Sequence, residues 1–477
     1  MTTNSILNLT FTQLREKYIN LELKPSDVTQ AYLAQLHNTN ELNHTITFCD
    51  ELALTQAARA DQAYKNGTYK FLEGMPLCVK DLFCTNQILT TAGSKMLSNF
   101  VPSYESIVTQ KAFDQGAIML SKTNMDEFAM GASNKYSAYG PALNPWNKAC
   151  VTGGSSGGSA GAVAAKGCLF ALGSDTGGSV RQPAAFCGIV GIRPTYGRCS
   201  RRGMIAFCSS LDQAGVFGRD VRSCAALLET IMGYDEYDST SAKKAVPNLM
   251  SITDDVEGLT IGVLTDSFVT DPSIKAQYQQ TQHMLEKLGA KLVDVDIKYM
   301  AESLAVYYVI APVEAASNLA RYDGIRYGLK GEGDTYEQQC MDARKHFGEE
   351  AKRRILLGTY FSSHEGYGTY FKQAIAVKNA LTQEFNKAFS KCDLLISPTT
   401  PHTAFELNAK KTPVEMYYED YYTCPINLAG ICGISVPVGL ADNGLPVGMQ
   451  IIAPAWREDM LIKGGLALEK AVNFEYL

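Results

Sequence analysis

Two short segments rich in glycine and serine contain the side chains best suited to covalent chemistry. Residues 152–159 read TGGSSGGS, and residues 173–183 read GSDTGGSVRQP. A serine hydroxyl can attack a carbonyl carbon when a base removes its proton. Glycine at this density lets main chains approach closely, as a site built from backbone N–H groups requires. The two segments therefore predict a serine nucleophile held in a tight loop.

Two other uses of such segments have to be weighed. The first segment has the glycine spacing of a P-loop, but no lysine follows its last glycine to meet a phosphate. It also fits G-x-S-x-G, the nucleophile elbow of α/β-hydrolases, in two registers, but residues 144–148 before it are turn-like and not a strand. That elbow also needs a distant histidine. Six histidines are candidates, none in a distinctive setting: His37, His44, His283, His346, His364 and His402.

Without a histidine the serine needs another base, and Lys80 is the candidate. It follows the apolar stretch 76–79, which predicts a buried strand. Burial lowers the pKa of a lysine because the charged form loses hydration, and the neutral amine can then accept a proton. A second serine can relay that proton, since a hydroxyl donates and accepts at once. The alternative is an ion pair between Lys80 and the adjacent Asp81.

Helices and strands alternate around these residues. An N-terminal segment of about residues 1–66 predicts three helices, at 11–20, from Pro25 onward, and at 51–66. The next elements are strands at 76–79 and 117–120 with a helix at 107–115 between them.

The C-terminal half predicts a mixed sheet. A strand at 259–264, a helix at 274–288 and a strand at 291–296 form a βαβ unit, so part of the sheet is parallel. Residues 434–440 and 446–452 predict a hairpin, with turn residues between them. No linker interrupts the chain. We therefore expect one large α/β domain over residues 1–477, a twisted mixed β-sheet core covered by helices on both faces, with the Gly/Ser-rich catalytic core at about 74–220.

The composition is that of an ordinary soluble enzyme, with 46% hydrophobic and 19% charged residues. A net charge of −6 argues against a broad basic surface for nucleic acid. The 13 cysteines form no C-x-x-C pair and no zinc-like cluster, which indicates buried thiols in a reducing compartment. No signal-like N-terminus or bilayer-length apolar run occurs. We expect a cytoplasmic protein with no membrane contact and no metal.

At the lysine and the two serine-rich segments, the sequence resembles the amidase signature family. The resemblance implies a Ser-cisSer-Lys triad in which Lys80 is the base, Ser155 the relay with a cis peptide, and Ser179 the nucleophile. We expect the transition-state oxyanion to accept hydrogen bonds from backbone N–H groups of the turn at residues 176–179. The predicted donors to the oxyanion are Thr176, Gly177 and Gly178.

A narrower resemblance is to the transamidase branch of that family, and it covers almost the whole chain. Its motifs include residues 122–131, 191–198, 209–213, 318–328 and 427–430. In that branch a free glutamine is bound by a tyrosine, an arginine and an aspartate. The matching residues are Tyr307, Arg354 and Asp420, although the adjacent Tyr308 and Arg353 leave the register open by one residue.

The same resemblance implies partners. Members of the branch form a heterotrimer with the B and C subunits of the amidotransferase, and Glu-tRNA(Gln) is bound mainly by the B subunit. No cofactor is expected in this chain, while the B subunit would use ATP and Mg²⁺ to convert misacylated Glu-tRNA(Gln) to Gln-tRNA(Gln). The branch implies that this chain is the glutaminase that supplies the ammonia.

Two further functions stay open. The chain could be a stand-alone amidase that acts on another small amide, or a non-catalytic scaffold, against which the intact lysine and serines argue.

The sequence departs from the family pattern at four positions, where Asn, Pro, Ala and Pro are usual: Leu82, Thr152, Gly161 and Cys432.

Overall fold

A computed structural model of the chain describes residues 2–265, 268, 269 and 271–477. Within that part, one 11-stranded sheet runs through the molecule in the order β1-β3-β2-β4-β6-β5-β10-β11-β9-β7-β8. The strands are β1 Thr45–Phe48, β2 Pro76–Lys80, β3 Ile118–Thr123, β4 Phe170–Ser174, β5 Val190–Arg193, β6 Ala214–Gly218, β7 Thr260–Leu264, β8 Lys291–Val295, β9 Leu394–Pro398, β10 Cys432–Leu440 and β11 Pro446–Ala453.

The sheet is mixed, as the sequence predicts. Strands β2, β3 and β4 are parallel to one another, and so are β7, β8 and β9. Antiparallel pairs join these two groups through β6, β5, β10 and β11. The predicted βαβ unit is confirmed as β7, α9 (Pro272–Lys287) and β8, and the predicted hairpin as β10 and β11.

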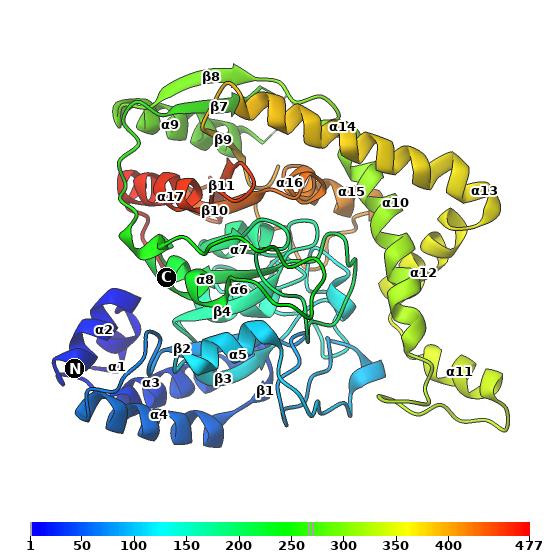
Figure 1. Cartoon of the computed structure of the whole chain (residues 1–477), viewed down its shortest axis with the longest axis horizontal. Helices are drawn as coiled ribbons and strands as arrows, with labels where there is room; N and C mark the ends of the chain where they lie inside the picture. Colours follow the sequence, from blue (N-terminus) through cyan, green and yellow to red (C-terminus); the bar gives the residue numbers. More distant parts are fainter. Residues whose placement is uncertain (1, 266–267, 270) are drawn as a thin grey trace.

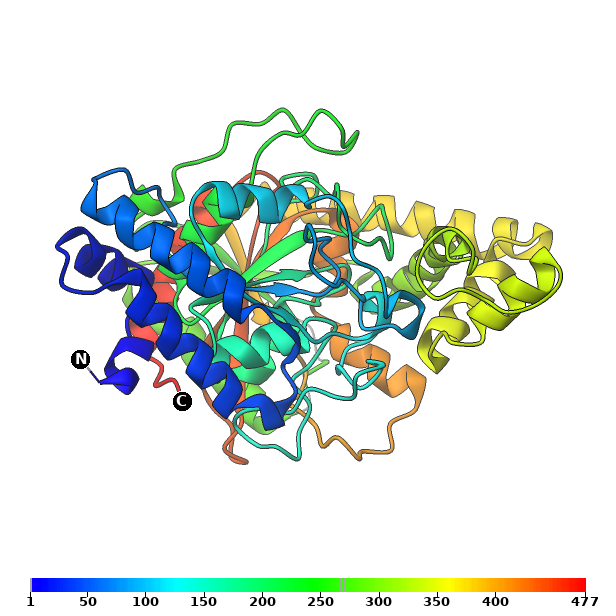
Figure 2. The same cartoon turned by 90° about the horizontal axis from the view of Figure 1, so that it is seen from below.

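Helices cover both faces of the sheet, which confirms the predicted fold class (Figure 1, Figure 2). The N-terminal helices, drawn in blue, pack at the end of the molecule that holds β1 to β3. The longer helices are α2 Phe11–Ile19, α3 Pro25–Asn38, α4 Asp50–Lys65, α5 Ile107–Asp114, α6 Gly157–Ala164, α8 Val221–Ile231, α10 Met300–Asn318, α11 Tyr336–Arg344, α12 Glu349–Phe361, α14 Lys372–Phe389 and α17 Glu458–Val472. The shorter ones are α1 Thr3–Leu7, α7 Arg181–Cys187, α13 His364–Gly366, α15 Pro413–Tyr417 and α16 Cys424–Ala429.

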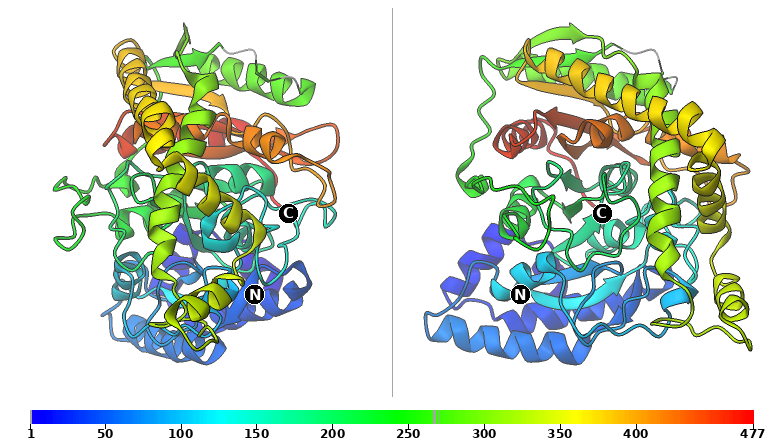
Figure 3. Two further views of the ribbon diagram at one scale, coloured as in Figure 1. Left: turned by 90° about the vertical axis from the view of Figure 1, so that its right-hand side faces the viewer. Right: turned by 45° about the vertical axis from the view of Figure 1, so that its right-hand side comes forward.

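Helices α10, α12 and α14 form an arm along one side of the sheet (Figure 3). Helix α10 packs against α12, α14 and α16, so the arm is tied to the body of the molecule. Helix α11 lies at the far end of this arm. The ring of Tyr307 in α10 lies against Gly177, so the arm reaches the second serine-rich segment.

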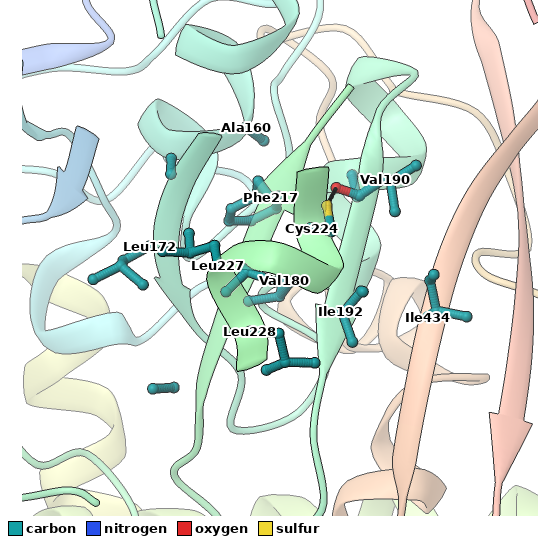
Figure 4. Close-up of a cluster of buried hydrophobic side chains, with 14 of the residues drawn as sticks. Ala160, Leu172, Val180, Val190, Ile192, Phe217, Cys224, Leu227, Leu228 and Ile434 are labelled. Carbon is teal, nitrogen blue, oxygen red and sulfur yellow. Dashed lines mark hydrogen bonds between the residues drawn. The ribbon is translucent and has the colours of Figure 1, made fainter. Parts of the chain in front are cut away.

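The centre of the core lies around β4, β6 and β5. Figure 4 shows Leu172, Phe217 and Ile192 from these strands in one cluster with Leu227 and Leu228 of α8. All of these side chains are fully buried. Fully burying such apolar side chains stabilises the fold by roughly 1.5–3 kcal/mol each. Strand β4, which ends at the second serine-rich segment, is therefore held firmly.

The cysteines belong to this packing and not to a covalent framework. All 13 lie within the described residues as free thiols, and all but Cys340 are buried. In the cluster of Figure 4, the Cys224 thiol donates to the carbonyl oxygen of Val190 at 3.6 Å. The expectation of buried, unpaired cysteines is confirmed.

Helix α6 packs unusually closely on its neighbours. Gly158 and Gly161 lie on one face of this helix, against the backbone of Asn124 and the imidazole of His44. The His44 ring is buried, and its Nε2 lies 2.8 Å from the carbonyl oxygen of Leu143. Because α6 starts directly after the serines of the first loop, this close contact helps to position them.

A substitution at Gly161 tests that contact. Gly→Ala inside a helix normally stabilises by about 1 kcal/mol. At Gly161 the new methyl would overlap the imidazole of His44, so we expect Gly161→Ala to destabilise by about 1–3 kcal/mol. In a His44→Ala background the same change should be neutral or stabilising. Urea unfolding of the four proteins measures this coupling, and equal effects of Gly161→Ala in both backgrounds would contradict it.

Candidate active site

Lys80 is the last residue of β2, a strand with β3 on one side and β4 on the other. Its side chain is fully buried. The ammonium nitrogen Nζ lies 2.8 Å from the hydroxyl oxygen of Ser155, 2.8 Å from that of Ser156 and 2.9 Å from that of Ser174. The structure thus brings the predicted base and the predicted relay into direct contact, and adds two hydroxyls that the sequence did not single out.

Burial lowers the pKa of Lys80 from 10.5 to about 7. The main cause is loss of hydration of the charged amine. Three buried carboxylates, Asp126, Asp175 and Asp212, favour the charged form and oppose this shift only in part. Lys80 therefore holds a large neutral fraction near pH 7, and a neutral amine is what proton abstraction from serine needs.

The alternative of a Lys80–Asp81 ion pair is not realised. The carboxylate of Asp81 instead lies 3.3 Å from the ammonium of Lys122, and both side chains are fully buried. Lys122 also donates to the Phe83 carbonyl at 2.8 Å and to the Thr90 hydroxyl at 2.7 Å. Asp81, the residue after β2, also accepts from the Thr91 N–H at 2.8 Å, so Lys80 and Asp81 have different partners.

The loop that contains Ser155 is fastened from two sides. The peptide bond between Gly154 and Ser155 is cis. The Gly154 N–H donates to the amide oxygen of Gln182 at 3.0 Å, and the Asp126 N–H donates to the carbonyl oxygen of Ser155 at 3.1 Å. The Asp126 carboxylate lies so close to Gly154 that no side chain would fit there. These contacts set the position of the Ser155 hydroxyl beside Lys80.

Asp126 itself organises the neighbouring loop. Its carboxylate accepts from the N–H groups of Asn134 at 2.8 Å and Tyr136 at 3.0 Å. Burial is the main cause that raises its pKa to about 6, and the N–H groups of Tyr136, Asn134 and Ser133 together with the charge on Lys80 reduce that shift. Asp126 thus holds the backbone of Asn134 and Tyr136 in place beside the loop that contains Ser155.

Ser179 lies in the turn between β4 and α7, with 8% of its surface exposed, whereas Lys80 and Ser155 are fully buried. This is the arrangement a nucleophile needs, because it must meet the substrate while its base stays shielded. The turn wraps around the carboxylate of Asp175, which accepts from the N–H groups of Gly178 at 2.9 Å and Val180 at 3.2 Å.

The Asp175 carboxylate is held by an all-buried network. It accepts from Arg181 Nε at 3.1 Å and from Asn427 Nδ2 at 2.8 Å. Burial alone would raise the pKa of Asp175, but Arg181 and Arg193 outweigh it and keep the pKa below its ordinary value. A fixed negative charge with this many partners makes the nucleophile turn rigid.

These contacts also decide which N–H groups of the turn are available to an oxyanion. A peptide plane points its N–H away from its C=O. The Asp175 carbonyl accepts from Arg193 Nη1 and Asn427 Nδ2, so the N–H of Thr176 points away from that network. The Gly177 carbonyl accepts from the Thr423 hydroxyl at 2.8 Å, while the Gly178 N–H donates to Asp175.

The Gly178 N–H is therefore occupied. Within the described part of the chain, the N–H groups of Thr176, Gly177 and Ser179 make no hydrogen bond. Unpaired backbone donors at a nucleophile turn are what an oxyanion hole requires. Of the three donors that we predicted, Thr176 and Gly177 have the free N–H groups.

The predicted substrate contacts come from three distant elements and converge on this turn. The Tyr307 ring of α10 lies against Gly177, where any side chain would overlap it. Arg354 of α12 and Asp420, which ends the 3-10 helix Tyr418–Asp420, are both buried. Burial is the main cause that raises the pKa of Asp420 well above its ordinary value, and Arg354 opposes this.

Of the two neighbouring arginines, Arg354 points inward. Its side chain is 4% exposed against 37% for Arg353, and its Nε donates to Glu350 at 2.8 Å. The guanidinium also lies over the ring of Tyr308, 5.0 Å from its centre. Tyr308 in turn stacks on Tyr417, so Tyr307 is the tyrosine that faces the turn.

No histidine takes part. Among the described residues, none of the six histidines hydrogen-bonds to Ser155 or Ser179. His37 pairs with Asp50 at 2.7 Å, and His402 lies 3.4 Å from Glu419. Burial lowers the pKa of His44 to about 4, and its ring faces Leu143 and not a serine. The geometry favours the lysine over a histidine-based triad.

Ser156, Ser174 and Asp175 are the residues that sequence reasoning missed. Asp175 did leave a signal, because it stands with Arg181 in a stretch almost free of charge. A lone buried carboxylate needs a cation, and Arg181 is the nearest one in the sequence. The two serines left no signal that distinguishes them from their neighbours.

No group of three or more His, Cys, Asp or Glu side chains within residues 2–265, 268, 269 and 271–477 is placed to hold a metal ion. In that same part of the chain, no helix has both the length and the apolar character to cross a bilayer.

The profile of the Amidase family matches residues 27–462. The A subunit of the Rhodospirillum rubrum glutamyl-tRNA(Gln) amidotransferase is 46% identical over 98% of this chain and 96% of its own.

Two solved structures show the same fold. The A subunit of the Thermotoga maritima glutamyl-tRNA(Gln) amidotransferase has a TM-score of 0.79 and 36% identity, covering 98% of this chain and 94% of its own. The peptide amidase of Stenotrophomonas maltophilia has a TM-score of 0.85 and 27% identity, covering 98% of this chain and 97% of its own.

The pH dependence of serine reactivity tests the role of Lys80. A serine-directed sulfonyl fluoride should modify Ser179 faster as the pH rises, because the neutral amine is the proton acceptor. The rate should reach half its maximum near the Lys80 pKa of about 7. Lys80→Arg, which stays charged, should remove this rise. A half-maximum near the ordinary lysine pKa of 10.5, or a rate independent of pH, would contradict the assignment.

Proposed function

The chain belongs to the amidase family, and from this premise we propose that it is the glutaminase subunit of a tRNA-dependent amidotransferase. It hydrolyses glutamine and supplies the ammonia that converts misacylated Glu-tRNA(Gln) to Gln-tRNA(Gln). The observation that carries the proposal is the near full-length match, at 46% identity, to a relative named as the A subunit of that enzyme. The contact between Lys80 and Ser155 and the convergence of Tyr307, Arg354 and Asp420 support it.

The chemistry follows from the shielded lysine. Ser179 Oγ attacks the side-chain amide carbon of glutamine while its proton passes to Ser155, and Ser155 gives its own proton to the neutral Lys80. The oxyanion is met by the free N–H groups of Thr176, Gly177 and Ser179. One such donor is worth roughly 2.7–4 kcal/mol of barrier.

Collapse of the tetrahedral intermediate breaks the carbon–nitrogen bond. Lys80 returns its proton through Ser155 to the departing nitrogen, which leaves as ammonia, and a γ-glutamyl ester forms on Ser179. Water then attacks the ester with the same base, and glutamate leaves. Every proton taken up by Lys80 is returned within one half-reaction, so the base is neutral again for the next attack.

Recognition of free glutamine uses the two buried charges beside the turn. An α-carboxylate suits the planar guanidinium of Arg354, and an α-ammonium suits the carboxylate of Asp420. Burial raises the pKa of Asp420, and an arriving ammonium would favour its charged form. Tyr307, which lies against Gly177, would position the glutamine side chain so that its amide reaches the turn.

The proposal places the remaining steps in partner chains, the B and C subunits of the amidotransferase. The B subunit would receive the ammonia, bind Glu-tRNA(Gln) and use ATP with Mg²⁺ to activate the glutamyl group, and the C subunit would complete the heterotrimer. The relatives' names designate one subunit of an enzyme, which supports an assembly of several chains. The cytoplasm is the compartment in which tRNA and these partners would meet this chain.

A stand-alone amidase is the alternative, and identity disfavours it. The fold of the peptide amidase is at least as similar as that of the Thermotoga maritima protein, so fold alone does not decide between them. Sequence identity, however, is 27% with the peptide amidase and 46% with the Rhodospirillum rubrum protein. A non-catalytic scaffold would have no need for a buried lysine among serine hydroxyls.

Replacement of the nucleophile tests the function directly. In the complex with the B and C subunits, the native chain should release ammonia from glutamine, and Ser179→Ala should lower kcat by at least roughly a thousandfold. Ser251→Ala, at an exposed serine far from the site in sequence, serves as the control and should keep native activity. Equal ammonia release by native and Ser179→Ala proteins would refute the nucleophile, and none from the native complex would refute the function.

The adjacent arginines provide a matched pair for the glutamine site. Arg354→Lys keeps the charge and the pairing with Glu350 but loses the planar fork, so KM for glutamine should rise roughly tenfold or more with little change in kcat. Arg353→Lys, on the exposed side of the same helix, should leave KM unchanged. Steady-state ammonia release measures both, and a larger effect at Arg353 would show that the register is wrong.

A further inference from the structure

The amine of Lys80 is surrounded by three hydroxyls in a site closed to water. Ser155, Ser156 and Ser174 lie 2.8, 2.8 and 2.9 Å from Nζ. All four side chains are buried, with no more than 1% of any of these residues exposed. The carboxylates that act on Lys80 from around the site, Asp126, Asp175 and Asp212, affect its charge but make no hydrogen bond to Nζ. The hydroxyls therefore decide how the amine is oriented.

The number of protons on the amine restricts what each hydroxyl can do. A neutral amine has two N–H donors and one lone pair, whereas an ammonium has three N–H donors. The Ser156 hydroxyl donates to the carbonyl oxygen of Ser174 at 3.2 Å, so its oxygen can only accept from Lys80. In the neutral state one further N–H and the lone pair remain for Ser155 and Ser174.

We propose that Ser174 is a positioning residue for the base: its hydroxyl accepts the second N–H of Lys80 and so directs the lone pair to Ser155. This inference rests on the proposed use of Lys80 as the base. With Ser174 and Ser156 as acceptors, the only proton that can move to Nζ is the one on Ser155. Ser155 can then take the proton of Ser179, which is the direction the reaction needs.

The same hydroxyl stabilises the charged state that follows. Once Lys80 has taken the proton from Ser155, its three N–H groups face three hydroxyl oxygens, and no water is needed. Ser156 and Ser174 keep their roles as acceptors before and after the transfer, and only Ser155 changes from donor to acceptor. Such a site needs little rearrangement at the moment of reaction.

The fold holds Ser174 in place for this role. It ends β4, and its backbone pairs with Ala214 of β6 in the sheet. Its N–H also lies 3.4 Å from the Ser156 hydroxyl, so the two acceptors are linked. The next residue is Asp175, whose carboxylate anchors the nucleophile turn. Ser174 thus connects the base to the rigid part of the turn.

The test measures the modification of Ser179 by a sulfonyl fluoride across pH in Ser174 variants. In this step the Ser179 oxygen bonds to sulfur, fluoride leaves, and the serine proton passes through Ser155 to Lys80. For Ser174→Ala we expect the maximal rate to fall roughly tenfold or more, since a hydrogen bond to a charged group is lost. The pH of half-maximal rate should move lower, because the ammonium loses an acceptor.

Three further variants make the result specific. Ser174→Thr keeps the hydroxyl and should keep both the native rate and the native pH profile. Ser174→Cys fills the same space with a poor acceptor and should resemble the alanine variant, which covers the case in which Ser174→Ala does not fold. Ser121→Ala removes another buried hydroxyl, which bonds to Thr45 and Cys78 and not to Lys80, and should change neither quantity. Melting temperatures confirm that each protein is folded.

Three outcomes would overturn the inference. An unchanged rate and pH profile in Ser174→Ala and Ser174→Cys would show that the hydroxyl does nothing for the base. A faster rate would show that Ser174 competes with Ser155 for the lone pair. A slower rate at an unchanged pH profile would show a structural role only. Because the reagent is not glutamine, a chain that reacts with it but releases no ammonia in the complex would refute the proposed function and leave the Ser174 inference standing.

Discussion

The structure depends on one constraint, which is that the Lys80 amine must be kept out of water and still have its hydrogen bonds satisfied. Burial lowers its pKa to about 7, and the surrounding serine hydroxyls replace the lost water. Small residues are needed around it because a side chain at Gly154 would overlap the Asp126 carboxylate, and one at Gly173 would overlap the ring of Phe217. The density of glycine and serine in residues 149–191 is therefore a packing requirement of the base and not a sign of flexibility.

Buried carboxylates hold the loops that surround this amine. The Asp126 carboxylate accepts from the N–H groups of Asn134 and Tyr136, and the Asp126 N–H donates to the Ser155 carbonyl in the first serine loop. The Asp175 carboxylate accepts from backbone N–H groups of the second serine loop. Both carboxylates also favour the charged form of Lys80, so the distance of each carboxylate from the amine affects the pKa of Lys80. Arg181 and Arg193 keep the pKa of Asp175 below its ordinary value, so this carboxylate stays charged, while burial of Lys80 outweighs the effect of the carboxylates and lowers the lysine pKa.

Much of this could be predicted from the sequence, because local patterns determine it. The strand before Lys80, the βαβ unit and the C-terminal hairpin follow from apolar periodicity and turn residues. The partner of Asp81 could not be predicted, since Lys122 reaches it across two paired strands. The same holds for Ser174 and for the register at Arg354, which depend on the direction in which each side chain points after the elements have packed. The site residues themselves stay predictions until variants are measured.

The site draws on two separate parts of the chain. The predicted base and serines lie within residues 80–179, whereas the predicted substrate contacts Tyr307, Arg354 and Asp420 come from the helical arm and the segment after it (Figure 2). Substitutions in the arm could therefore change which amide is bound while Lys80, Ser155 and Ser179 stay as they are.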